Sequence, residues 1–340
     1  MYSKPLKPVL IYCLTALLTT QCATKSNDSI IMSVNGPVSV EEMGESLIHE
    51  HVLVDFIGAD QISEKRWDKA EVIKVVLPYL KEIKMLGGKT FIECTPNYLG
   101  RDPVLLKALS DSTGLNIITN TGYYGARNNK FLPAHAFTET ADQLAARWIG
   151  EWESGINGTN IRPGFIKIGV DRGNLSKIHQ KLVTAAARTH LQTGLTIASH
   201  TGTAVPALEE IELLKREGVA PDAFIWVHAQ AEKDLENHIK AAKEGAWISL
   251  DGLNDNNPDH YLQMLKNLKT YGLLSNALIS HDAGWYSPGE VNGGKFRAYT
   301  SLFKILLPRL KEAGFSDKEI RQLLVDNPQR AFEINIRKIH

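Results

Sequence analysis

The chain has 340 residues, of which 43% are hydrophobic, and its 38 basic residues balance its 38 acidic ones. A chain of this length can bury a large core, and α/β barrels often reach it as one domain. Because no basic stripe or block of like charges is present, nucleic acid is excluded as an expected partner.

The beginning of the chain differs in kind from the rest. Lys4 and Lys7 precede an apolar stretch over residues 9–18, and small or polar residues follow it. This is the layout of a secretory signal peptide, and the apolar stretch is too short to span a bilayer. We therefore predict a leader and tether over residues 1–26; a disordered tail or an uncleaved anchor is the alternative.

Cysteine usage agrees with export. Cys22 resembles the lipid-attachment site of a bacterial lipoprotein, although Gln21 stands where a small residue is usual. We expect a protein that is exported, either periplasmic or attached to a membrane through a lipid on Cys22. The remaining domain, residues 27–340, contains only Cys94, which is expected to be a buried small hydrophobe without a disulfide partner.

From about Gly44 onward, short β-rich runs alternate with longer amphipathic patterns. The sequence predicts strands over residues 47–55, 89–95, 116–123, 164–170, 195–200, 223–228, 246–251 and 277–282. It predicts helices over residues 69–86, 103–112, 138–153, 178–193, 206–217, 235–244 and 260–271, with two more over 297–313 and 317–325. Strands and helices in strict alternation predict a (β/α)₈ barrel, and a doubly wound sheet is the alternative.

The positions of the polar residues favour the barrel. Candidate ligands fall at the carboxyl ends of the first, fourth, fifth, sixth and eighth predicted strands, whereas a doubly wound sheet gathers its ligands at one switch point. The chain has no Gly-x-Gly-x-x-Gly after the first strand and no Walker loop, which disfavours a nucleotide cofactor.

The candidate ligands are of types that hold catalytic metals. His49 and His51 are two residues apart in a predicted strand, so both rings point to the same face, and Glu50 between them points to the other. His200, His228 and Asp282 each end another apolar run. Histidines and an aspartate from several strand ends predict a metal site for catalysis. By the same alternation, His281 faces the helices as a packing residue.

Lys167 is the unusual member of the set. It lies inside the apolar run 164–169, where burial disfavours a charged ammonium group. A neutral amine can add carbon dioxide to become a carbamate, N6-carboxylysine, which can bridge two cations. Pairing with a barrel carboxylate such as Glu93 is the alternative, and the surrounding histidines favour the bridge.

These residues resemble the motifs of the phosphotriesterase family of the amidohydrolase superfamily. The resemblance runs from about Gly44 to Phe332 and rests on the segments 44–51, 100–102, 121–124, 162–167, 199–201, 227–228, 280–282 and 326–328. It implies a barrel with two divalent ions, zinc or alternatively manganese or cobalt, and a homodimer. It also implies that His49, His51 and Asp282 hold one ion, that His200 and His228 hold the other, and that carboxylated Lys167 and a hydroxide bridge them.

The expected reaction is hydrolysis of a lactone or carboxylic ester by this hydroxide, with phosphotriester turnover secondary. Asp282 is expected to accept the proton of the hydroxide. Tyr124 is either a hydrogen-bond donor to the developing oxyanion or a pocket wall. Gly252 stands where family members often carry His or Arg, so one substrate contact is expected to be missing, and the loop 284–290 is expected to form a pocket wall. An amide hydrolase of the N-acyl amino acid type, or a lyase such as a decarboxylase with one metal, are the alternatives.

Overall fold

The computed structural model describes residues 1–2 and 29–339. The predicted leader, Cys22 and the predicted domain boundary at residue 27 lie outside the described residues. Within the described part, no helix is both long and apolar enough to cross a bilayer.

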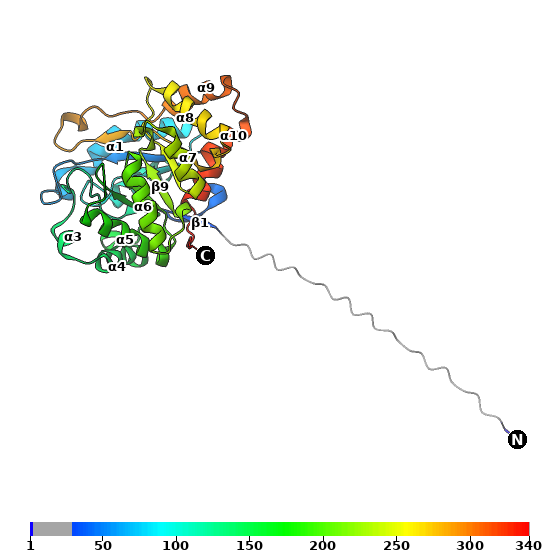
Figure 1. Ribbon diagram of the computed structural model, residues 1–340. Coiled ribbons are helices and arrows are strands. Elements are labelled where there is room, and N and C mark those ends of the chain that lie inside the picture. The colour runs from blue at the N-terminus through cyan, green and yellow to red at the C-terminus, as the bar shows by residue number, and fades with distance from the viewer. Residues whose placement is uncertain (3–28, 340) are drawn as a thin grey trace.

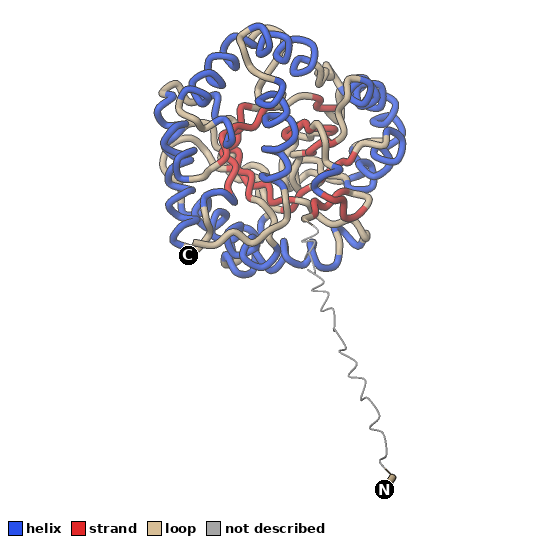
Figure 2. Tube along the Cα trace, turned by 90° about the vertical axis from the view of Figure 1, so that its right-hand side faces the viewer, coloured by secondary structure: helices blue, strands red, loops and turns tan. Residues whose placement is uncertain are grey.

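Parallel strands form the centre of the molecule, and helices surround them (Figure 2). One sheet has the order β11-β10-β9-β8-β7-β6, and the other has the order β12-β3-β4-β5. The central strands are β3 (Ser46–Leu53), β4 (Thr90–Glu93), β5 (Asn116–Ile118), β6 (Asn120–Thr121), β7 (Phe165–Gly169), β8 (Ile197–His200), β9 (Phe224–Val227), β10 (Trp247–Leu250), β11 (Ala277–Ile279) and β12 (Gly284–Tyr286).

The two sheets are connected at both sides. The third predicted strand is one extended segment that Thr119 divides into β5, which pairs with β4, and β6, which pairs with β7. At the other side, the backbone N–H of Asp282 donates to the carbonyl of His49 at 3.0 Å, and that of His51 donates to Ala283 at 3.0 Å. The segment after β11 thus returns to β3, and the fold is the expected α/β barrel.

The helices follow the strands in chain order, and α4 to α8 pack side by side around the outside (Figure 1). Asp68 caps the amino end of α1, and Gly194 ends α5 with a left-handed φ of 75°. The helices are α1 (Lys69–Met85), α2 (Pro103–Thr113), α3 (Ala134–Thr138), α4 (Ala141–Ser154), α5 (Lys177–Thr193), α6 (Ala204–Arg216), α7 (Leu235–Glu244), α8 (Pro258–Thr270), α9 (Leu307–Glu312), α10 (Asp317–Arg321) and α11 (Asn327–Phe332).

Alternation along the strands divides the core into two parts. In β7, Ile166 and Ile168 pack in the outer layer between strands and helices, while Phe165 packs inside the ring. Lys167 shares the inner face with Phe165, because side chains two residues apart point to the same side. The barrel therefore has an apolar base and carries its polar groups towards the carboxyl ends of the strands.

The structure adds elements that the sequence pattern did not predict. An antiparallel hairpin of β1 (Ile30–Ser33) and β2 (Gly36–Ser39) places Ile31 in the inner apolar cluster beside Phe165. The short strand β12 pairs with β3 inside a segment expected to be a loop. The predicted helices 297–313 and 317–325 are also modified, because each contains a π-helical segment, Leu302–Leu306 and Gln322–Asp326.

Candidate metal centre

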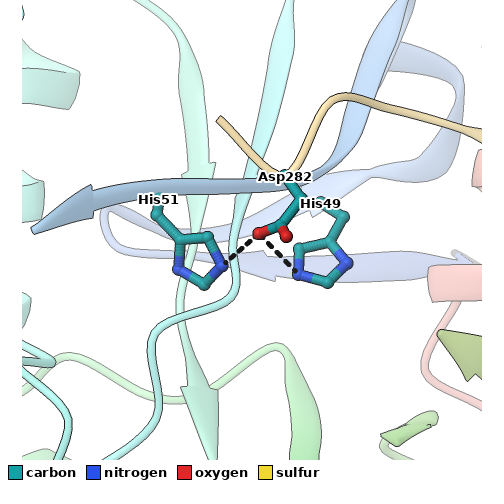
Figure 3. A group of neighbouring side chains, drawn as sticks. All are labelled: His49, His51 and Asp282. Carbon is teal, nitrogen blue, oxygen red and sulfur yellow. Dashed lines mark ion pairs between the residues drawn. The ribbon is translucent and has the colours of Figure 1, made fainter. Parts of the chain in front are cut away.

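Two histidines of β3 and an aspartate just after the end of β11 face one another (Figure 3). Oδ1 of Asp282 lies 3.0 Å from Nε2 of His51 and 3.8 Å from Nε2 of His49. The ligand atoms of the three residues all lie within 4.8 Å of one another, close enough to share one divalent ion.

The Asp282 side chain points to the metal centre, but not because of alternation along a strand, as was expected. The eighth strand was predicted to include Asp282, but β11 ends at Ile279, and Asp282 has a left-handed φ of 51°. His228 likewise follows the end of β9 with a φ of 62°. Both side chains are therefore placed by unusual backbone conformations just after a strand, which are common at functional sites.

A buried carboxylate that sequence reasoning missed holds two of the histidines. Oδ2 of Asp251 lies 2.9 Å from Nδ1 of His49, and Oδ1 lies 2.6 Å from Nδ1 of His228. Burial opposes ionisation of Asp251, but the charges and hydrogen bonds of His228 and His49 outweigh it and hold its pKa well below the usual value. Because Nδ1 of each ring donates to a carboxylate, Nε2 is left as the nitrogen that can bind a metal.

His51 is oriented by a different group. Its Nδ1 lies 2.8 Å from Oγ1 of Thr95, and that hydroxyl in turn donates to Oε1 of Glu93 at 2.5 Å. Burial raises the pKa of Glu93, which also accepts the backbone N–H of Val52. The alternative pairing of Lys167 with Glu93 is therefore not formed, because the Glu93 carboxyl accepts hydrogen bonds from Thr95 and from the backbone of β3.

Lys167 is the clearest unsatisfied group of the site. Its side chain is 2% exposed, and Nζ has no hydrogen-bond partner among the described residues. A buried ammonium ion without partners is strongly unfavourable, so the group needs either a neutral state or an additional ligand. Gly122 packs directly against this position, since a Cβ there would lie 2.2 Å from the carbonyl oxygen of Lys167.

The remaining expected ligand, His200, ends β8 beside His228, and their ring centroids are 4.4 Å apart. Burial lowers the pKa of His200 well below its usual value, and it also lowers the pKa of His49 to about 4. Both rings are therefore neutral at neutral pH, which is the form that binds metal. The centroid of Tyr124 lies 4.9 Å from that of His200, so the tyrosine stands beside the same ligand group.

A buried acid on the neighbouring helix fixes the backbone around His200. Glu210 of α6 accepts the hydroxyl of Ser199 at 2.5 Å and that of Thr201 at 2.6 Å. Burial raises the pKa of Glu210 to about 8, so this carboxyl is protonated at neutral pH. Its contacts with the residues on both sides of His200 position that ring from behind.

As expected, His281 faces away from the metal centre and Glu50 has a structural role. Nδ1 of His281 lies 2.6 Å from Oε1 of Glu50, and its Nε2 accepts the backbone N–H of Leu302. Glu50 also accepts the hydroxyl of Ser280 and the backbone N–H of Ala283. These contacts tie the segment that carries Asp282 to β3.

The metal centre opens into a cavity with about 490 Å³ of empty space, part of it continuous with solvent. All six expected ligands and Tyr124 line it. The remaining wall is mostly apolar and includes Val54, Phe56, Cys94, Pro96, Leu99 and Trp285. Trp285 comes from the segment after β11, which agrees with the expected wall, and Cys94 is buried and forms no disulfide within the described residues.

The departure at Gly252 has a structural reason. A Cβ at this position would lie 2.6 Å from Nε2 of Gln230 and 3.0 Å from the hydroxyl of Tyr261. Gln230 in turn accepts the backbone N–H of Asp251, and Tyr261 accepts that of Gly252. Without rearrangement, these two side chains leave no room for a larger residue at position 252.

Comparisons with known proteins agree with this arrangement. Residues 30–332 match the model of the phosphotriesterase family. A phosphotriesterase homology protein of Escherichia coli is 31% identical over 87% of this chain and 100% of its own length. Aryldialkylphosphatase of Saccharolobus solfataricus is 26% identical over 87% of this chain and 96% of its own length. A mutant organophosphorus hydrolase of Deinococcus radiodurans superposes with a TM-score of 0.79 at 26% identity, covering 89% of this chain and 97% of that one.

Similar proteins carry names for different reactions. A phospho-furanose lactonase of Mycoplasmopsis synoviae matches at 27% identity over 88% of this chain and 90% of its own length. An N-acetyltaurine hydrolase of Dictyostelium discoideum also matches at 27%, over 77% of this chain and 74% of its own length. Members of the family typically use a binuclear metal site, and the histidine and aspartate groups found here can bind metal. The chain belongs to the phosphotriesterase family and is a metal-dependent hydrolase that acts on small molecules.

Proposed function

We propose that this protein hydrolyses a lactone or carboxylic ester at a centre of two divalent metal ions. The observation that carries the proposal is the buried amine of Lys167, which has no hydrogen-bond partner within residues 29–339 and lies among four histidines and Asp282. A site of this composition fits two cations that share a bridging anion. Zinc suits the nitrogen and oxygen ligands, and manganese or cobalt are alternatives.

The donor set fits the metals residue by residue. His49, His51 and Asp282 would hold one ion, since their ligand atoms already converge. His200 and His228 would hold the other. Addition of carbon dioxide to the unprotonated form of the Lys167 amine would form an N–C bond and release one proton, and the resulting carbamate would supply an oxygen to each ion.

The side chains of the site would transfer the proton and donate a hydrogen bond to the oxyanion. When bound, two divalent ions lower the pKa of a water molecule and polarise the oxygen of the bond to be cleaved. Asp282 would accept the proton of the attacking water and carry it towards the leaving group. Burial raises the pKa of Tyr124, so its hydroxyl stays protonated and can donate a hydrogen bond to the oxyanion.

The cavity favours a carbonyl substrate over a phosphotriester. Its wall beyond the ligands is mostly apolar, and Phe56 and Trp285 pack edge to face in it with ring centroids 5.5 Å apart. One flat acyl or lactone ring fits such a wall more readily than the three substituents of a tetrahedral phosphotriester. The lactonase name of one relative supports the same bond type.

An amide of the N-acyl amino acid type is the second candidate. An amide requires a proton on its leaving nitrogen, and Asp282, which lies beside His51, can deliver the proton taken from water. The N-acetyltaurine hydrolase among the similar proteins supports this bond type for the family.

Rates of turnover of matched substrates test the proposal. Metal-loaded protein is assayed on γ-lactones, carboxylic esters, N-acyl amino acids and phosphotriesters of similar size, with Asp282→Asn as the inactive control. We expect the highest kcat/KM on lactones or esters. A higher kcat/KM on the amides would favour the second candidate, and turnover of phosphotriesters alone would contradict both.

A further inference from the structure

Two arginines line the open side of the metal centre. A second cavity, with about 1100 Å³ of empty space partly open to solvent, is lined by Arg127 and Arg172 as well as by His200, His228 and Asp282. Arg127 also lines the inner cavity. Within residues 29–339, neither guanidinium group forms an ion pair with a carboxylate. Two cations thus stand beside the reaction centre with their hydrogen-bond donors free.

The acidic residue between them is already engaged. Asp171 accepts the backbone N–H of Arg127 at 2.7 Å and that of Asn128 at 3.2 Å. Nε2 of His179 lies 3.8 Å from the same carboxylate. Asp171 therefore anchors the loop through its backbone and forms no ion pair with either arginine.

The loop that carries Arg127 is held in an uncommon conformation. Arg127, Asn128 and Asn129 have φ values of 61°, 57° and 60° in succession. Asparagine tolerates this left-handed region, but an arginine is strained in it. The turn is closed by a hydrogen bond from the N–H of Asn129 to the carbonyl of Gly125, and His179 contacts both of these residues. An arginine kept in this position points to a use for its side chain.

The position of the Arg127 guanidinium relates it to the substrate pocket. Its carbon Cζ lies 4.7 Å from the ring centroid of Phe56, a residue of the apolar wall. This stacking places the Arg127 guanidinium at the rim of the cavity. The apolar wall beside it offers no acceptor for the guanidinium N–H groups among the described residues. A substrate in the cavity would meet apolar groups around its reactive end and cationic donors at the rim.

We propose that the substrate carries an anionic oxygen group, a carboxylate or a phosphate, which Arg127 and Arg172 bind while the bond to be cleaved lies at the metal centre. The planar fork of a guanidinium matches the paired oxygens of such a group. This inference rests on the proposed function and narrows its substrates to anionic esters, lactones or amides.

Matched esters test the inference on metal-loaded protein. The neutral probe is 4-nitrophenyl valerate, the carboxylate probe is mono-4-nitrophenyl glutarate, and the third probe is an ester of the same length that ends in phosphate. We expect kcat/KM of the preferred anionic probe to exceed that of the neutral probe at least tenfold, and the two anionic probes show which anion is bound. Equal or faster turnover of the neutral probe would overturn the inference while leaving the proposed function intact.

Substitutions of the two arginines test whether they cause the preference for anionic probes. Arg127→Asn removes the charge but suits the left-handed backbone, and we expect it to lower kcat/KM of the anionic probe roughly 10- to 100-fold, as expected for loss of a charged hydrogen bond. Its kcat/KM on the neutral probe should change less than threefold. Arg172→Gln should act in the same direction, and Arg127→Lys should retain part of the preference.

The matched control is Arg162→Gln, since Arg162 is an exposed arginine just before β7, at the opposite end of that strand. This substitution should change kcat/KM on neither the anionic nor the neutral probe. If Arg127→Asn slowed both probes equally, Arg127 would have a structural role and the inference would fail. If none of the three esters, nor their amide analogues, were hydrolysed by protein with two metals bound, the proposed function itself would be wrong.

Discussion

Oδ1 of Asp282 lies 3.0 Å from Nε2 of His51, and this contact joins the segment after the last barrel strand to the first strand. Burial opposes ionisation of Asp282, but the hydrogen bond to His51 and the nearby histidine charges outweigh it and lower its pKa. The carboxylate is therefore ionised at neutral pH and ready both to bind a cation and to accept a proton.

Asp282→Asn should keep the fold and most of the metal, because four histidines and Lys167 remain. An amide cannot act as a base, and loss of a general base typically lowers the rate about 10²- to 10⁴-fold. We expect kcat to fall by at least about 10²-fold, measured together with the metal content of the same sample. A variant with normal kcat would remove Asp282 from the proton-transfer step.

His281→Asn is the matched control for Asp282→Asn, because it alters the neighbouring residue. Because His281 bonds to Glu50 and Leu302 outside the centre, its loss should lower the free energy of unfolding by about 1–3 kcal/mol. Its kcat in folded, metal-loaded protein should change far less than that of Asp282→Asn. The opposite order of effects on kcat would mean that the two residues exchange roles.

Lys167→Ala should lose bound metal and activity together, since it removes the group that would bridge the two cations. A short carboxylic acid such as propionate should restore part of both, because its two oxygens can occupy the vacated space. Metal analysis and rates with and without the acid provide the check. Normal metal content in the variant would argue against the carbamate.

Asp251→Asn should weaken metal binding without touching a ligand. The two rings use different oxygens of Asp251, and the amide replaces one of these oxygens with an NH₂ group that cannot accept a hydrogen bond from Nδ1. Loss of such an orienting carboxylate typically costs about 10–100-fold in metal affinity. Competition with a chelator measures the affinity, and Asp317→Asn, at a side chain that is 90% exposed, is the control. Equal affinities in the two variants would exclude the orienting role.

Glu210→Gln should change how stability depends on pH. The pKa of Glu210 is about 8 in the folded protein against an ordinary value of 4.5, so between these values the unfolded chain loses a proton that the folded protein keeps. The contribution of Glu210 to wild-type stability is therefore fully present below pH 4.5 and is lost as the pH rises to 8. The variant lacks this decline. The free energy of unfolding of the variant minus that of wild type should therefore increase by roughly 2–5 kcal/mol between pH 4.5 and pH 8. Chemical unfolding at pH 4.5, 6 and 8 measures it, and a constant difference would contradict the raised pKa.

Most of the fold could be predicted because alternation and helical periodicity are strong signals. Residues 235–244 match α7 at both ends, and the strand predicted over 164–170 differs from β7 by one residue at each end. The hairpin β1–β2 lies before Gly44, where the alternation of strands and helices begins, and the turn sequence Asn35-Gly36 is the signal that could have indicated it. The first π-helical segment begins at Leu302, whose backbone N–H donates to Nε2 of His281, and the helical periodicity of the sequence does not specify such a tertiary contact.

The site was less completely predictable. The expected ligands converge as the strand ends implied, but the positive φ of Asp282 and His228 follows from their tertiary contacts and not from the strand pattern. Asp251 had a usable signal, because it ends the seventh predicted strand as the other candidates end theirs. The positions of Phe56 and Arg127 depend on long loops, whose shape local sequence does not specify.

The number of divalent ions bound per chain tests the central claim most directly. Metal-free protein is titrated with zinc, and bound metal and esterase or lactonase rate are followed together by elemental analysis and kinetics. We predict saturation at two ions per chain, with full activity only when both are bound and loss of activity on chelation. Full activity with a single ion, or after complete removal of metal, would contradict the binuclear hydrolase described above.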